Sequence, residues 1–248
     1  MAAKRYRAIV CEGPDDLAAI RALLLEDGCR KKPQLTAPAS ASRAQQFEIG
    51  DLEIHLEARN GKSGLAELAI DLAEGGAIGR PDMILVSFDP DSDPPAREFN
   101  FFEKAFVDHG GARGRVGPIE RNSAGARVFK MNRREVILLP APWRSMELER
   151  FAGLPDEHCL ERVLIDGILQ ADVQESVARW AKDATTSLCA LVPKHGYKRA
   201  FRLWSAALHP DAESFVPKLL QADDHKHACL KALRSTPAAL ALLTLLGG

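Results

Sequence analysis

The chain has 248 residues, of which 46% are hydrophobic and 27% charged, and its formal net charge at pH 7 is −1. This composition is typical of a globular protein with one large domain or two small ones. The balanced charge excludes a protein that coats nucleic acid through overall basicity. The dispersed cysteines form no C-x-x-C pair, which excludes a zinc ribbon and favours reduced thiols in a cytosol. They are Cys11, Cys29, Cys159, Cys189 and Cys229.

Neither a targeting segment nor a membrane segment is indicated. The apolar run near the N-terminus is too short for the core of a signal peptide. The longest apolar run, Ala238–Leu246, is interrupted by Thr244 and is too short to span a bilayer. We therefore expect a soluble, cytoplasmic protein without a membrane partner.

The first part of the chain alternates predicted strands and helices. In chain order these are a strand (6–11), a helix ending near Gly28, a strand or hairpin (47–56), a helix from residue 65, a strand (83–88), a helix opened by Pro94 and Pro95, and a hairpin (127–139). Asp15 or Asp16 is expected to cap the first helix, because aspartate is a favoured N-cap residue. The alternation predicts an α/β fold with a mostly parallel sheet.

The remainder of the chain has helical periodicity with few strand signals. The helical segments are 146–151, 158–169, 173–188, 197–208, 215–220 and 228–246. We therefore expect an α/β domain over residues 1–143 and an all-helical domain over residues 144–248, with the boundary near Trp143.

Three aspartates, Asp89, Asp91 and Asp93, follow the predicted strand 84–88 directly and stand two residues apart. Alternate residues of an extended segment point the same way, so the three carboxylates would converge. Converging carboxylates repel one another unless a cation lies among them, and oxygen ligands suit Mg²⁺, Mn²⁺ or Ca²⁺. An aspartate- and proline-rich turn between a strand and a helix is the alternative interpretation.

Basic residues with interspersed glycines fill residues 113–134, and Glu120 is the single acidic residue among them. Within it, Arg113, Arg115 and Arg121 are candidates for phosphate contacts, and a solvated loop followed by a hairpin is the alternative. Gly61-Lys62-Ser63 is no phosphate-binding loop, because Leu56 stands where that motif requires glycine. Lys62 is interpreted as a turn lysine or a single phosphate contact.

The order of two acidic motifs resembles the Toprim domain family. Glu12-Gly13-Pro14-Asp15-Asp16 follows the first predicted strand, and Asp89-Pro90-Asp91-Ser92-Asp93 follows a later one. The resemblance covers about residues 5–140 and is greatest to small stand-alone Toprim proteins, akin to the overcoming-lysogenisation-defect nucleases and the 5S-rRNA maturase. It implies a Rossmann-like domain that binds Mg²⁺ or Mn²⁺ through Glu12, Asp16, Asp89, Asp91 and Asp93, with Glu12, Asp89 and Asp91 catalytic. Asp16 has a helix cap as its alternative role.

The activity that this resemblance implies is metal-dependent hydrolysis of a phosphodiester in DNA or RNA. Topoisomerases need a tyrosine nucleophile in another domain, and this short chain has only Tyr6 and Tyr197. Primases and the recombination-mediator relatives carry zinc, which the cysteine spacing excludes. No ATPase motif is present, so an associated ATPase would be a separate partner chain. Nucleic acid is the expected partner. The basic patch within Lys194–Arg202 is a candidate for a second contact to it, and a solvated helix start is the alternative.

Alternative functions come from other classes. The Toprim fold could serve as a non-catalytic module that binds nucleic acid or protein. A haloacid-dehalogenase-like phosphatase also uses Asp-x-Asp after an apolar strand, but it expects Thr or Val where Asp93 stands and normally places the motif on its first strand. A response-regulator receiver would need neither Asp91 nor Asp93.

Overall fold

A computed structural model describes the chain in several stretches. These are residues 4–32, 44–75, 81–90, 100–111, 120–121, 127–131, 136–144, 159–170, 215–221 and 223–247, with short pieces at 183–184, 186–187, 190–191, 198–199, 201–203 and 206. The expected helix openings at Pro94 and Pro95 and the expected helix 146–151 lie outside these residues.

Eight strands form one sheet in the order β2-β3-β4-β1-β5-β8-β7-β6. They are β1 (Arg5–Cys11), β2 (Arg30–Lys31), β3 (Ala44–Ile49), β4 (Leu52–Ala58), β5 (Met83–Phe88), β6 (Glu120–Arg121), β7 (Arg127–Met131) and β8 (Val136–Pro142). The central strands β4, β1, β5 and β8 are parallel, and antiparallel strands extend the sheet on both sides. The fold is therefore α/β, and the expected parallel sheet is its centre.

The connections between the parallel strands reverse direction at β1. The chain passes from β1 through α1 (Pro14–Glu26) and the β3–β4 hairpin to one side of β1. From β4 it returns through α2 (Gly61–Glu74) to β5, on the other side of β1. Open α/β sheets bind ligands at such a reversal point, beyond the carboxyl ends of the strands. Here that point lies between the ends of β1 and β5.

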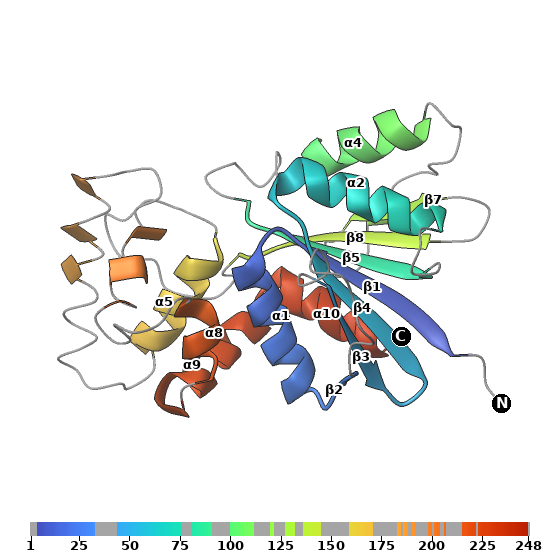
Figure 1. Cartoon of the computed structure of the whole chain (residues 1–248). Helices are drawn as coiled ribbons and strands as arrows, with labels where there is room; N and C mark the ends of the chain where they lie inside the picture. The colour runs from blue at the N-terminus through green and yellow to red at the C-terminus, as the bar shows by residue number, and fades with distance from the viewer. Residues whose placement is uncertain are drawn as a thin grey trace. The chain divides into compact units, whose positions relative to one another are not determined.

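Helices cover both faces of the sheet (Figure 1). On one face, α2 and α4 (Asn100–Gly111) pack against alternate residues of β1 and β5, including Val10, Val86 and Phe88. Phe102 and Phe106 of α4 enter this core and are fully buried. On the other face lie α1 and the C-terminal helix α10 (Pro237–Gly247), which contacts β5 and β8.

Two local expectations for the helices are wrong. Gly13 is the N-cap residue of α1 and Pro14 opens it, so Asp15 and Asp16 lie within the first turn and neither caps it. Proline suits that position because its missing N–H would have no helical partner. Helix α2 begins at Gly61 and not near residue 65, so Lys62 lies in a first helical turn and not in a free turn.

Other local expectations are confirmed. Helix α1 ends at Glu26, and the Cys29 N–H donates to the Leu24 carbonyl across Gly28, whose φ is 85°. That arrangement is a Schellman motif, which favours glycine at the left-handed position. The two predicted hairpins form as the antiparallel pairs β3–β4 and β7–β8.

The expected helix over 228–246 is two helices. Helix α9 spans Asp223–Arg234, and α10 begins at Pro237. Proline has no N–H with which to continue the hydrogen bonding of α9, and its ring disfavours a helix through the preceding residue. The other helices described in this part are α5 (Leu160–Gln170) and α8 (Phe215–Leu219).

The chain divides into two compact units that differ from the two expected domains. Unit 1 comprises residues 1–88, 94–142 and 237–248, and unit 2 comprises residues 89–93 and 143–236. One division between the units falls between Pro142 and Trp143, whereas α10 belongs to the unit that holds the sheet. Its buried residues, among them Leu242 and Leu245, give the reason, because an apolar helix is stabilised by covering an apolar sheet face.

Within unit 2, α5 and α9 pack closely at a glycine. A Cβ atom on Gly167 of α5 would overlap the Cβ of Ala232 and lie 3.0 Å from the carbonyl oxygen of Ala228. Both contacts come from α9. The absence of a side chain at residue 167 therefore sets how closely these helices approach.

We predict that Gly167→Ala destabilises the protein by about 1–3 kcal/mol, because overpacking outweighs the gain in helix propensity. Gly64→Ala in α2 is the matched control, since its Cβ would meet only the Arg59 Cβ at 3.7 Å. We expect Gly64→Ala to be neutral or stabilising by up to about 1 kcal/mol. Urea unfolding followed by tryptophan fluorescence measures both; equal effects of the two substitutions would contradict the packing analysis.

Candidate active site

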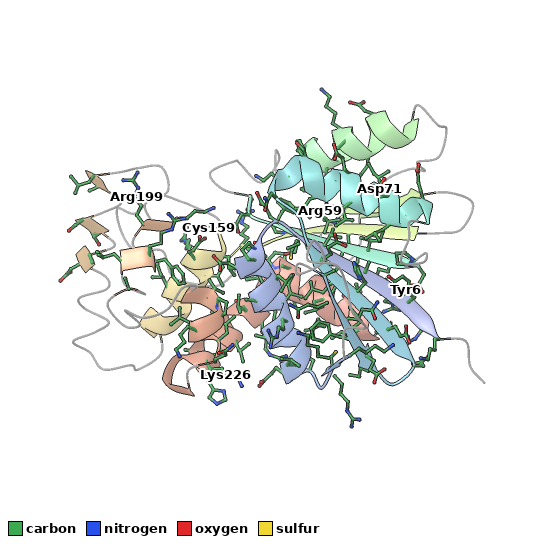
Figure 2. All side chains as sticks on the ribbon, viewed as in Figure 1. Tyr6, Arg59, Asp71, Cys159, Arg199 and Lys226 are labelled. Atoms are coloured by element: carbon green, nitrogen blue, oxygen red, sulfur yellow. The ribbon has the colours of Figure 1, made fainter. Side chains whose placement is uncertain are left out.

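The carboxyl ends of three neighbouring parallel strands lie together at one edge of the sheet in unit 1. Cys11 at the end of β1 is level with Ala58 of β4 on one side and Ser87 of β5 on the other. The Arg59 N–H donates to the Cys11 carbonyl oxygen at 2.8 Å, which extends the β1–β4 pairing by one residue. In Figure 2 Arg59 lies at this end of the sheet and Tyr6 near the opposite end.

The segment that follows β1 carries the first acidic motif. Glu12 is half-buried, and Asp16 is buried in the first turn of α1. The Asp16 carboxylate lies over the turn, since a Cβ atom on Gly13 would be 3.4 Å from its Oδ2 atom. Burial raises the pKa of the Cys11 thiol well above its usual value, and the nearby carboxylates of Asp16, Glu57 and Glu12 raise it further. Negative charge therefore gathers around the end of β1.

The neighbouring strand β4 adds a row of polar and charged side chains on one face of the sheet. His55 is buried, and its Nε2 atom lies 2.9 Å from Oε2 of Glu57. The other oxygen of Glu57 lies 3.2 Å from Nε of the exposed Arg59. The hydrogen bond from His55 lowers the pKa of Glu57 more than burial raises it, so Glu57 is a stable carboxylate at this edge. No motif marks this row in the sequence; its i, i+2 spacing on a strand is the one signal that indicates a shared face.

Asp89 follows β5 directly, and its carboxylate has two described partners within unit 2. Oδ1 accepts a hydrogen bond from the backbone N–H of Leu160 at 2.9 Å, and Nζ of Lys198 lies 3.3 Å from Oδ2. Leu160 is the first residue of α5, where the N–H groups have no helical acceptor. The Asp89 carboxylate thus caps a helix that begins far along the chain, and the helix dipole favours its negative charge.

The donor atoms and the charge environment of Asp89 are compatible with a bound metal ion. Its oxygens are hard donors of the type that Mg²⁺ and Mn²⁺ prefer, and Oδ2 already has the positive charge of an ammonium group beside it. Asp89 therefore fits a cation. Within the described ranges, no group of three or more His, Cys, Asp or Glu side chains is arranged to hold one. Asp91 and Asp93 lie outside those ranges.

The predicted phosphate-contacting residues are only partly described. Lys62 is half-buried in the first turn of α2, the helix that begins just beyond the end of β4. Arg113 and Arg115 lie outside the described residues, and Arg121 is placed only as part of the backbone of β6. Of the basic stretch 194–202, Lys198 pairs with Asp89, whereas Arg199 and Arg202 are exposed. No local pattern indicated that Lys198 would meet an aspartate.

The described cysteines are poorly suited to act as nucleophiles. Burial raises the pKa of Cys29 to about 11 and that of Cys229 to about 12. Burial also raises the pKa of Cys159 well above its usual value, and the carboxylates of Glu161 and Asp89 add to the effect. A thiol must lose its proton to become a nucleophile, so these groups are largely unreactive near neutral pH.

No single helix in the described stretches combines the length and apolar character needed to cross a membrane. Lys226–Arg234 and Pro237–Gly247 would reach that length and composition only if they were taken together across the bend between them.

The fold resembles a solved structure. The crystal structure of a hypothetical protein from Pyrococcus horikoshii OT3 covers 98% of this chain and 100% of its own, with a TM-score of 0.61 and 14% sequence identity. At that identity the likeness concerns the fold alone. A lactoylglutathione lyase from Agrobacterium tumefaciens aligns over 57% of this chain and 94% of its own at 16% identity, but its TM-score of 0.19 supports no structural inference.

Comparisons by sequence find no relative of assigned function. No family model matches the chain, and no curated protein matches it. The class of protein that the structure defines is thus an α/β protein with an acidic segment after each of two adjacent parallel strands.

We predict that the native protein reacts slowly with iodoacetamide at pH 8 at Cys11, Cys29, Cys159 and Cys229. Their pKa values are raised in the folded state, so each thiol stays protonated until the pH rises well above the value at which an unfolded thiol ionises. Mass spectrometry of tryptic peptides measures the labelling, with guanidinium-unfolded protein as the control. Rapid native labelling of any of the four would contradict the prediction at that cysteine.

We predict that Asp89→Ala destabilises the metal-free protein by about 2 kcal/mol, because the Leu160 N–H and Lys198 lose their acceptor. Asp89→Asn keeps an oxygen for the N–H and loses only the ionic pair, so we expect a loss of about half as much. Urea unfolding in EDTA measures both variants. A loss for Asp89→Asn equal to that for Asp89→Ala would show that capping of α5 contributes nothing.

Proposed function

We propose that the protein is a divalent-metal-dependent phosphodiester hydrolase that acts on DNA or RNA, built on a Toprim-like α/β domain with a helical partner domain. One observation carries the proposal: β1 and β5 are adjacent and parallel, with Cys11 level with Ser87, and the chain continues from them directly into Glu12 and Asp89. This is the reversal point at which α/β sheets bind ligands.

The acidic residues would hold Mg²⁺ or Mn²⁺. In the proposal Asp89, Asp91 and Asp93 supply ligands from the segment after β5, and Glu12 and Asp16 supply carboxylates from the segment after β1. A bound divalent ion would stabilise the negative charge that develops on the phosphate oxygens during displacement. The cation already beside Asp89 supports this ligand role, since the carboxylate is placed where a positive charge is accommodated.

Chain residues would do the remaining chemistry. In the proposal Glu12, which is half-buried and directly follows β1, accepts a proton beside the scissile phosphate. Lys62, near the helix start after β4, would contact a phosphate oxygen, and Arg113, Arg115 and Arg121 would contact the nucleic-acid backbone. The net charge of −1 does not favour tight non-specific binding, so a structured substrate or a partner protein, such as a separate ATPase, would supply affinity.

A non-catalytic binding module is the second candidate, and one observation favours it. Both oxygens of Asp89 have partners in the chain itself, so this carboxylate already has a structural role as a helix cap and ion-pair partner. In such a module Glu12, Asp16 and Asp89 would stabilise the fold and supply negative charge without taking part in catalysis.

We predict metal-dependent cleavage of labelled nucleic acid. Wild type is incubated with single-stranded DNA, double-stranded DNA and structured RNA in Mg²⁺, Mn²⁺ or EDTA, and products are resolved on denaturing gels. Glu12→Gln and Asp91→Asn are each expected to lower the rate by about 100-fold or more, the usual contribution of a positioned acid–base group or of a metal ligand. These two variants avoid the helix cap that Asp89 makes.

Glu67→Gln, an exposed position on α2, is the matched control and should cleave like wild type. Wild type that binds Mn²⁺ in calorimetry but cuts none of these substrates would favour the binding module. Cleavage at the wild-type rate by both Glu12→Gln and Asp91→Asn, or cleavage by wild type in EDTA, would rule out the proposed site.

A further inference from the structure

We infer that Lys198 and a divalent cation are alternative partners of the Asp89 carboxylate, so that the lysine is the resident cation of the metal-free protein and must leave Oδ2 when metal binds. The inference rests on the proposed function, because it assumes that Asp89 binds Mg²⁺ or Mn²⁺. It concerns only residues of unit 2 and adds a regulatory step to the proposed site.

The two oxygens of Asp89 differ in how firmly they are held. Oδ1 is bonded to a backbone N–H at the start of α5, and that donor cannot move without moving the helix. Oδ2 faces an ammonium group at the end of a flexible four-carbon side chain. Exchange is therefore expected at Oδ2, while the bond to Leu160 persists and keeps the carboxylate oriented.

The ion pair is exposed enough to be displaced. The Lys198 side chain is 29% exposed and the Asp89 side chain 12% exposed, at an Nζ–Oδ2 separation of 3.3 Å. Ion pairs that water reaches contribute little stability, and a lysine ammonium regains strong hydration when it is released. The ion pair with Asp89 therefore contributes little to holding Lys198 in this position.

The ammonium and a divalent ion would not share the oxygen. Two positive groups on one carboxylate oxygen would lie within a few ångströms of each other, where they repel each other. Occupation by metal and occupation by Lys198 are consequently exclusive, and the lysine lowers the apparent affinity for metal. Removing the ammonium should raise that affinity.

The test compares Mn²⁺ binding by calorimetry in wild type, Lys198→Gln and Arg199→Gln. Both substitutions remove one positive charge from adjacent positions, and Arg199 is exposed, so a general change in charge would affect both alike. We expect Lys198→Gln to bind Mn²⁺ about fivefold more tightly than wild type, the factor set by loss of a partly exposed ion pair. Arg199→Gln should bind like wild type.

A second readout uses the unmodified protein and stays decisive if Lys198→Gln fails to fold. Acetic anhydride labels free lysine amines, and peptide mass spectrometry follows Lys198 with the exposed Lys104 as internal reference. Saturating Mn²⁺ should increase the labelling of Lys198 relative to Lys104 severalfold, because the ammonium is released from Asp89.

The outcomes separate the exchange from the proposed function. Wild type that binds Mn²⁺, with an unchanged affinity in Lys198→Gln and unchanged labelling of Lys198, overturns the exchange and leaves the proposed metal site standing. An equal gain in both glutamine variants also overturns it, in favour of a general charge effect. Absence of Mn²⁺ binding in wild type and in Lys198→Gln overturns the exchange and the proposed function together.

Discussion

The parallel hydrogen bonding of β1 between β4 and β5 is the constraint on which the rest of the sheet depends. It places β1 in the interior, where Ile9 and Val10 are fully buried, and it makes the ends of three strands level at one edge. Because the polypeptide must then leave the sheet at that edge, each of the three strands ends at the same edge whatever its distance in sequence from the others. A glycine cap and a proline at N1 allow the chain to turn from β1 straight into α1.

The contacts of Asp89, the residue that follows β5, depend on a different part of the chain. Asp89 lies one residue beyond a buried strand, yet its described partners come from the start of α5 and from Lys198. The carboxylate satisfies a helix N–H that would otherwise lack an acceptor, and the ammonium balances its charge. The same atoms that suit a cation are thus used by the chain itself. This dual use connects the stability of unit 2 to any ligand that binds Asp89.

The periodicity of the sequence predicted most elements of the sheet, but less of how they are capped and connected. The strand from Tyr6 to Cys11, both hairpins and the end of α1 near Gly28 are present as expected. The wrong predictions concern positions where two local signals compete. Asp15 and Asp16 are favoured N-cap residues, but Pro14 opens the helix before them and Gly13 is the N-cap. The run 228–246 is apolar at helical spacing throughout, and only Pro237 marks the break. The sequence predicted that an acidic segment follows each of two strands. This part of the candidate site depends only on the order of residues along the chain.

The sequence by itself determined the elements and the positions of the carboxylates after β1 and β5, because side-chain periodicity and turn residues act over a few positions. Tertiary structure alone decided the strand order that makes those two strands neighbours, the return of α10 to the sheet and the pairing of Asp89 with residues 71 and 109 positions away. Such contacts depend on how apolar faces pack after the elements have formed. Many basic residues could have paired with Asp89 by charge, and only the packing of unit 2 selects Lys198.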